Sequence, residues 1–284
     1  MNAPDRINKL PDIQSQVDTR NTAIDAVGIK GIRHPVTILT GTGPLPTIAT
    51  LSMTVGLAPT TKGTHMSRFV ELLEMQRAPI SVSRFRQMTA RMIERLDAQD
   101  GTLEIRFPYF VRKVAPVSGV ESRLDYDVCW RGTLTSNGTY TFWTAVTVPV
   151  TSLCPCSKEI SEYGAHNQRS HITIEAEIAG EMAIEELIAI AEQSASCEVY
   201  GLLKRPDEKY VTERAYDNPK FVEDLVRDVA ITLDKERRVV AFTVEAENFE
   251  SIHNHSAFAR VVRANSEQTA SPRHHGAIFN CVSR

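Results

Sequence analysis

Alternation of apolar and polar residues predicts β-strands over most of the chain. In residues 171–178 (HITIEAEI), isoleucine or alanine at every second position would lie on one side of a strand, with threonine and glutamate on the other. The same kind of pattern predicts strands at 27–39, 46–57, 102–114, 120–135, 139–150, 170–179, 237–248 and 256–263.

A second spacing, with apolar residues three and four positions apart, predicts helices. Between 82 and 98 the residues that share one helical face are Val82, Phe85, Met88, Met92 and Leu96. Helices are predicted at 66–77, 82–98, 182–196 and 218–234. For the last of these, Asn218 is the expected N-cap and Pro219 the expected first helical residue.

In chain order these elements form two ββααββ units, at 27–136 and 137–264. This order predicts an α+β protein with antiparallel sheets. Residues 1–26 and 265–284 are polar without a sustained period and are predicted to be flexible tails. Sheets with both helices on one face leave open edges that other copies normally close, so an oligomer is expected.

Composition restricts the possible functions. The 284 residues are 42% apolar and 24% charged, as in soluble globular proteins. A net charge of −3 gives no basic footprint, so nucleic acid is not an expected partner. No apolar run approaches the roughly 20 residues that span a membrane. The N-terminus lacks the apolar segment of a secretion signal, and five cysteines is an odd number, so a cytoplasmic protein with reduced thiols is expected.

Two cysteines and a histidine between 151 and 170 are the first candidates for chemistry. Cys154 and Cys156 flank a proline that favours extended chain, which would send their side chains to opposite faces. One metal ion would therefore take one of the two thiols, with His166 as a second ligand. The alternative is that both cysteines are small buried side chains beside a turn.

A second polar cluster, ESIHNH, occupies residues 250–255. Its titratable groups, Glu250, His253 and His255, are suited to proton transfer, although each histidine alone could be a surface or packing residue. Carboxylates are also dense between 205 and 227. Glu208, at an expected loop end, and Glu223, at an expected helix start, are candidates there, but the sequence does not separate them from Glu213 or Asp224.

Five motifs, in order between Val27 and Ala264, carry a family resemblance. They are KGTHMSRF at 62–69, CPCSKEIS at 154–161, GAHNQRSH at 164–171, RPDEKYVTERAYDNPKFVEDLVRD at 205–228 and ESIHNHSAF at 250–258. Together they resemble type IB GTP cyclohydrolase I. The resemblance implies the tunnel fold, in which each subunit has two ββααββ modules and several subunits, here a homotetramer, join their sheets into a barrel. It also implies conversion of GTP and water to 7,8-dihydroneopterin triphosphate and formate, the first step of folate and pterin synthesis.

The resemblance also implies roles for individual residues. Cys154, His166 and Glu208 match the metal ligands, for zinc or manganese, and Cys154, Glu250 and His253 match catalytic positions. Glu223 falls where related enzymes hold the guanine edge. His255 and Arg169 are expected substrate contacts, and further cations for the triphosphate are Arg68, Lys204 and Arg205.

Two other functions are compatible with parts of this pattern. A 7-cyano-7-deazaguanine reductase would use its cysteine as a nucleophile with NADPH, but a Glu-Ser-Lys-Ser-Leu-Lys-like cofactor run is not found. A non-catalytic metal- or purine-binding protein would be expected to lack the proton-transfer groups, yet Glu250, His253 and His255 are all present.

Overall fold

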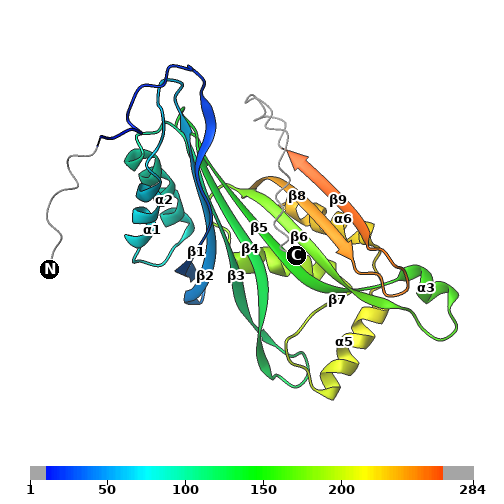
Figure 1. Ribbon diagram of the computed structural model, residues 1–284. Coiled ribbons are helices and arrows are strands. Elements are labelled where there is room, and N and C mark those ends of the chain that lie inside the picture. Colours follow the sequence, from blue (N-terminus) through cyan, green and yellow to red (C-terminus); the bar gives the residue numbers. More distant parts are fainter. Residues whose placement is uncertain (1–10, 265–284) are drawn as a thin grey trace.

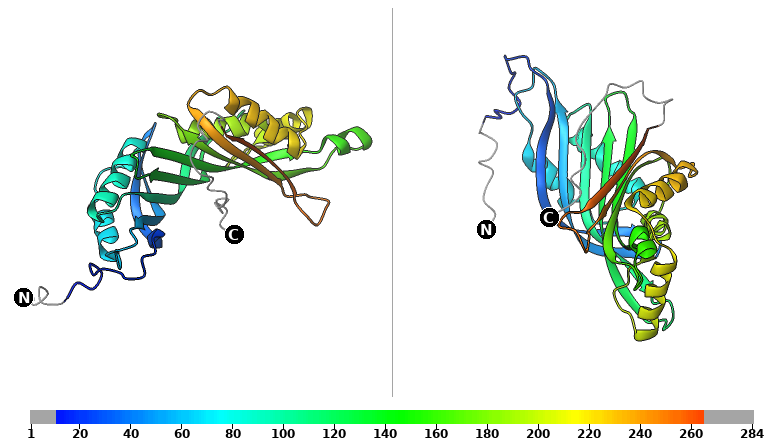
Figure 2. Two further views of the ribbon diagram at one scale, coloured as in Figure 1. Left: turned by 90° about the horizontal axis from the view of Figure 1, so that it is seen from above. Right: turned by 90° about the vertical axis from the view of Figure 1, so that its right-hand side faces the viewer.

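The computed structural model describes residues 11–264, which form one curved antiparallel sheet with helices on one of its faces (Figures 1 and 2). Along the sheet the described strands follow the order β1-β2-β3-β4-β5-β6-β8-β9, and the short β7 pairs with β5. Their bounds are β1 Ile24–Thr40, β2 Gly43–Leu57, β3 Gly101–Val114, β4 Glu121–Leu134, β5 Tyr140–Leu153, β6 Asn167–Ile178, β7 Cys197–Glu198, β8 Val239–Asn248 and β9 Ala257–Ala264. The sheet therefore crosses the proposed module boundary at 136/137 without a break, because β4 pairs with β5.

The eight long strands are those that the alternation predicted, with ends that differ by a few residues. In β6, every second residue from Ile172 to Ile178 is buried against the helices, as the period of two requires. The strands β1 and β2 are longer than predicted and meet in a tight turn at Gly41 and Thr42. Gly43, which closes that turn, has φ +118°, a conformation that L side chains rarely adopt.

Two pairs of helices cover the same face of the sheet (Figure 2). The first pair, α1 (Met66–Glu74) and α2 (Val82–Arg95), packs on the first strands, and the second pair, α4 (Ile184–Ser194) and α6 (Val222–Asp234), packs on β5 to β9. One continuous apolar core lies between helices and sheet. At its centre Phe85, Trp130 and Phe142 meet edge to face, with ring centroids 5.8–6.0 Å apart.

Three described elements were not predicted from the sequence. They are α3 (Pro155–Ile160), β7 and α5 (Arg205–Asp217). Helix α5 is mostly exposed and charged, so it has no apolar period to reveal it. The predicted helix 218–234 was wrong at its start: Asn218 ends α5, and α6 begins at Val222 after Phe221. Glu208, expected at a loop end, consequently lies in the first turn of a helix.

Residues 11–23 precede β1 and lie against the loop before α1. The backbone N–H of Asp18 donates to Thr60 O at 2.9 Å, and Lys62 and Gly63 donate to Gln16 O and Gln14 O at 3.2 Å each. The flexibility expected for 1–26 stays a prediction. Residues 1–10 and the predicted tail 265–284 lie outside the described residues.

The strands β1 and β9 form the two ends of the sheet. Part of the outer edge of β1 is covered by Ile80, which exchanges backbone hydrogen bonds with Thr37 and Leu39. On β9, Phe258 and Val262 are more than half exposed. Among the helices between residues 11 and 264, none combines the length and apolar character needed to cross a bilayer.

Candidate functional site

Several of the predicted site residues lie where β5 and β8 end and β6 begins, at the right of Figure 1. Cys154 follows the last residue of β5, His166 precedes the first residue of β6, and the segment 249–256 follows β8. In antiparallel neighbours the end of one strand lies beside the start of the next. The pairs Leu153–Asn167 and Ser170–Asn248 put all three segments side by side.

Cys154 and His166 lie next to each other because the loop between them is closed by hydrogen bonds. The N–H of Cys154 donates to His166 O at 3.1 Å, and the N–H of His166 donates to Ser157 Oγ at 3.2 Å. Cys154 is the N-cap of α3, where its Sγ accepts the Ser157 N–H at 3.4 Å. Its neighbour Cys156 lies inside α3 and is exposed, so the two thiols have different surroundings.

The imidazole of His166 is held through one of its two ring nitrogens. Nδ1 lies 3.1 Å from Gln168 Oε1 and 3.3 Å from Ser251 Oγ. A metal-bound histidine commonly uses one ring nitrogen for the metal and engages the other with an acceptor. With Nδ1 engaged, Nε2 is the nitrogen left for a ligand, so the thiol and imidazole of this pair fit a divalent metal such as zinc.

Glu208, the third predicted ligand, is not brought into a cluster with this pair. It is exposed in the first turn of α5. Within residues 11–264 no group of three or more histidine, cysteine, aspartate or glutamate side chains is positioned to hold a metal ion. The single chain therefore joins two of the three predicted ligands and leaves the carboxylate apart.

The turn that carries Glu208 is fixed by its neighbour Asp207, which the sequence did not single out. Asp207 is fully buried and accepts the backbone N–H groups of Val117 and Ser118 at 2.8 Å each. It also accepts the Ser118 hydroxyl at 2.6 Å and the Lys204 N–H at 2.8 Å. Burial alone would raise the pKa of Asp207, but these hydrogen bonds outweigh it and hold the pKa well below its usual range. They tie the start of α5 to the turn between β3 and β4.

The proton-transfer candidates lie in the exposed segment after β8. The rings of His253 and His255 are stacked, with centroids 5.2 Å apart and planes 14° from parallel, and Glu250 is half-buried. Ser251 connects this segment to the pair of Cys154 and His166, the predicted ligands, through its contact with His166. The segment is also fixed by the N–H of Phe249, which donates to Arg169 O at 3.0 Å.

Two predicted nucleotide contacts, Arg169 and Glu223, lie on β6 and on α6. Arg169 is exposed on β6, two residues after the start of the strand. Glu223 is exposed in the first turn of α6. The N–H of Lys220, just before that helix, donates to Leu153 O at 3.0 Å. The start of α6 is therefore attached to the end of β5, one residue before Cys154.

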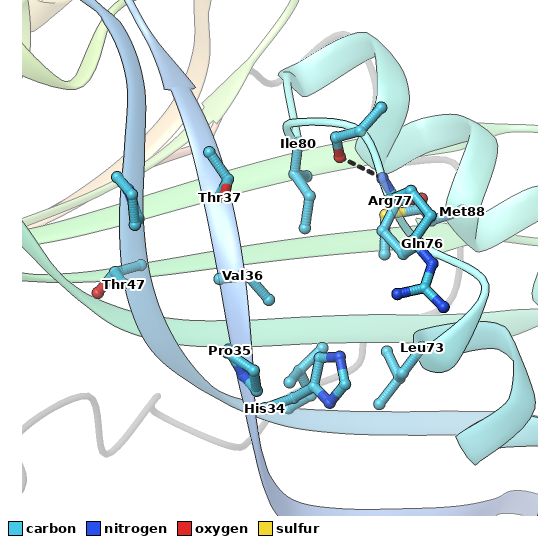
Figure 3. Close-up of a pocket in the computed structure, with 13 residues that line it drawn as sticks. His34, Pro35, Val36, Thr37, Thr47, Leu73, Gln76, Arg77, Ile80 and Met88 are labelled. Carbon is cyan, nitrogen blue, oxygen red and sulfur yellow. Dashed lines mark hydrogen bonds between the residues drawn. The ribbon is translucent and has the colours of Figure 1, made fainter.

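A cavity of about 300 Å³ lies elsewhere, between β1, β2 and the connection from α1 to α2 (Figure 3). Its wall is largely apolar, with His34 and Arg77 among its polar groups. None of the predicted site residues lines it. The chemistry is therefore expected at the strand ends and not in this cavity.

Comparison with known proteins decides the family. A family model described as type I GTP cyclohydrolase FolE2 matches residues 10–259. The chain belongs to the type I GTP cyclohydrolase FolE2 family. It is 61% identical over 255 residues to GTP cyclohydrolase FolE2 of Burkholderia multivorans, covering 89% of this chain and 94% of that one. The protein of the same name from Cupriavidus necator is 59% identical over 254 residues, with 89% and 95% covered.

Solved structures support the fold of this FolE2 family member. The uricase of Arthrobacter globiformis superposes with a TM-score of 0.50 at 8% identity, covering 88% of this chain and 96% of that chain. A hyperthermostable mutant of the urate oxidase of Bacillus sp. TB-90 gives the same TM-score and identity, with 86% and 99% covered. The predicted tunnel fold is thereby confirmed.

The sequence did contain a signal for the groups beneath the site. Four polar residues occupy positions of β5, β6 and β8 where alternation puts side chains in the core; they are Ser152, Gln168, Ser170 and Asn248. Buried polar side chains are normally present for a specific hydrogen bond. Polar residues in core-facing register could therefore have marked this end of the sheet.

Proposed function

We propose that this chain is a type IB, metal-dependent GTP cyclohydrolase I that converts GTP and water to 7,8-dihydroneopterin triphosphate and formate. Membership of the FolE2 family supports the reaction. The observation that carries the proposal is that Cys154 and His166 lie next to each other at the strand ends. Both match ligand positions of the family that the sequence resembles, and hydrogen bonds close the loop between them.

We assign Cys154, His166 and Glu208 as the ligands of a zinc or manganese ion. Three protein ligands leave a position open for substrate or water, which is the arrangement of catalytic sites. When bound, the metal would supply an activated water for attack on carbon 8 of guanine. The exposed carboxylate of Glu208 must come closer to the pair than it lies in the isolated chain.

His253 and Glu250 are assigned to proton transfer. Opening of the guanine imidazole needs a proton at a ring nitrogen, and the later sugar rearrangement needs an acid and a base. A neutral imidazole can accept a proton and an imidazolium can donate one near pH 7. The contact of Ser251 with His166 supports this assignment, because it keeps the segment that carries both residues beside the metal ligands.

Glu223 is assigned to guanine and Arg169 to the nucleotide. A carboxylate can accept two hydrogen bonds, from the ring N–H and the exocyclic amine of guanine, which adenine does not present in the same pattern. The guanidinium of Arg169, exposed at the start of β6, is suited to phosphate. His255, stacked on His253, is assigned to substrate contact beside it.

A homotetramer is proposed as the active form. The strands at the ends of the sheet offer backbone groups for pairing with another copy. Exposed Phe258 and Val262 on β9 support association at that end. Assembly would also change the surroundings of α5, which bears the carboxylate that the isolated chain leaves apart.

The test is turnover of GTP by metal-stripped protein after addition of zinc or manganese, with ATP as the matched control. Formate release and pterin fluorescence after oxidation are the readouts. Metal-dependent turnover of GTP and none of ATP is expected. A folded protein that binds GTP without turnover would refute the enzymatic assignment in favour of a binding protein. GTP turnover that a chelator does not reduce would refute the proposed requirement for a metal ion.

A further inference from the structure

A row of four hydrogen-bonded, buried polar side chains lies beneath the candidate metal ligands. Gln168 Nε2 donates to Ser152 Oγ at 2.9 Å, the hydroxyls of Ser152 and Ser170 are 2.7 Å apart, and Ser170 Oγ donates to Asn248 Oδ1 at 2.7 Å. Both serines are fully buried, and Gln168 and Asn248 are 8% and 3% exposed. Burial of so many polar groups is unfavourable unless each one is hydrogen-bonded. The adjacent core-facing positions of the three strands hold the apolar residues Val150, Ile172 and Ala246, so packing alone does not explain the polar ones.

The hydrogen bonds that link these four side chains all donate in one direction, from Gln168 toward Asn248. A hydroxyl has a single proton. Because Ser170 donates its proton to Asn248, it must accept the proton of Ser152. Ser152 then has no proton left and accepts from the amide NH₂ of Gln168. The amide is thereby oriented with its oxygen away from Ser152.

That oxygen faces the imidazole of His166, 3.1 Å from Nδ1. An amide oxygen can only accept a hydrogen bond, so Nδ1 must carry the proton. The hydroxyl of Ser251, 3.3 Å from the same nitrogen, is compatible because it can accept as well. A lone pair on Nδ1 would instead face the lone pairs of Gln168 Oε1.

We propose that Gln168 is a positioning residue that holds His166 as the Nδ1–H tautomer, so that Nε2 presents its lone pair to the metal. In this proposal Ser152, Ser170 and Asn248 fix the orientation of the Gln168 amide. This role of Gln168 rests on the proposed metal-dependent function, because the tautomer of His166 matters only if its imidazole is a metal ligand. The effect on the ring is a property of the protein without metal and is measurable there.

The tautomer is tested by NMR of ¹⁵N-histidine-labelled, metal-free protein at a pH above the titration of its imidazoles. The His166 resonance is assigned by its loss in His166→Gln. In the wild type, His166 is expected as the Nδ1–H form. In Gln168→Met, whose side chain has a similar length but offers only a weakly accepting sulfur, the ring is expected to shift toward the Nε2–H form.

Metal affinity is the second readout, measured by competition with a chelator. Gln168→Met is expected to bind zinc about 10–100-fold more weakly, the usual effect of removing the partner of a ligating histidine. Gln168→Glu still offers an acceptor to Nδ1 and is expected to keep the wild-type affinity, although the buried charge lowers its thermal stability. If Gln168 had only a structural role, the zinc affinity of each variant would instead fall with its thermal stability.

The control variant is Gln76→Met. Gln76 donates to Ala78 O at 2.6 Å in the connection between α1 and α2, so the same substitution there removes a hydrogen bond far along the chain from the site. It is expected to leave tautomer and metal affinity unchanged. The proposal is overturned if His166 of the wild type is the Nε2–H form, or if Gln168→Met changes neither readout. Failure of the proposed function appears separately, as wild-type protein that binds no metal or does not turn over GTP.

Discussion

An ion pair between Lys113 on β3 and Glu192 on α4 joins the two proposed modules, and breaking it should destabilise the whole chain. Lys113 Nζ lies 2.7 and 2.6 Å from the two carboxylate oxygens of Glu192. Each side chain is only 13% exposed. The hydroxyl of Tyr126, on β4, donates to the same carboxylate at 2.9 Å. The perturbation is Glu192→Gln, which keeps the shape and removes the charge.

The expected loss follows from what remains after the substitution. Removing one partner of a buried pair leaves an uncompensated charge and costs about 3–5 kcal/mol. Because a small part of each side chain reaches solvent, about 3 kcal/mol is expected for Glu192→Gln. Lys113→Met should cost about 1 kcal/mol less, since the carboxylate keeps the Tyr126 hydrogen bond. The double variant leaves no charge unpaired and should recover most of the loss.

The assay is equilibrium unfolding in urea at one fixed protein concentration. The chain has two tryptophans, Trp130 on β4 and Trp143 on β5, so single-tryptophan variants report on each side of the module boundary. The control is Glu213→Gln, which removes an exposed partner of Lys209 and should cost no more than about 0.5 kcal/mol. A loss in Glu192→Gln as small as in this control would refute the reasoning.

Three further predictions concern the site and the sheet. Cys154→Ala should lose bound metal and GTP turnover together, whereas Cys156→Ala, which changes an exposed side chain, should keep both. Equal loss of bound metal in the two variants would show that Cys154 is the wrong choice of ligand. Glu223→Gln should raise the KM for GTP and leave metal content unchanged, and metal loss instead would make Glu223 a ligand. Burial, with Glu245 and Glu104 nearby, raises the pKa of Glu175 from 4.5 to about 7 despite Arg131. Ionisation of this carboxyl then opposes folding, with no penalty below pH 4.5, a rising penalty up to about pH 7 and the full penalty above it. Glu175→Gln should therefore raise the Tm at pH 8 and not at pH 4.5, and parallel pH profiles of the two proteins would contradict this.

The strands were predictable because their pattern is local. A sheet with one buried face imposes a period of two on each strand, and β6 follows it without interruption. Helices α1, α2, α4 and α6 were predictable for the same reason, since each buries one stripe of side chains. Helix α5 buries only Asp207 and Ala215, so nothing periodic marks it. The N-cap prediction at Asn218 used a sound local rule, but that residue closes α5 and its amide bonds to Ala195 O at 2.8 Å.

The site was predictable only as far as its residues follow the strands directly. Cys154 and His166 flank the ends of paired strands, so their proximity follows from register once β5 and β6 are known to be neighbours. The contact between Ser251 and His166 depends in addition on β8 pairing with β6, which crosses three helices in sequence. No sequence spacing encodes such a non-local pairing, and a family resemblance was needed to connect these segments.

The position of Glu208 does not follow from strand register, because the residue lies on a helix. Its helix starts at a turn fixed by Asp207, and three of the four hydrogen bonds that hold Asp207 come from Val117 and Ser118, in the turn between β3 and β4 of the other proposed module. The position of the third predicted ligand therefore depends on a part of the chain that contributes no predicted ligand itself. Because a carboxylate on an exposed first turn cannot be oriented by burial, its final placement must come from what contacts α5. The same dependence makes Ser118→Ala informative. This variant should weaken metal binding, measured by chelator competition, although Cys154, His166 and the hydrogen bond between them are unchanged. An unaltered metal affinity would show that the start of α5 does not set the position of Glu208.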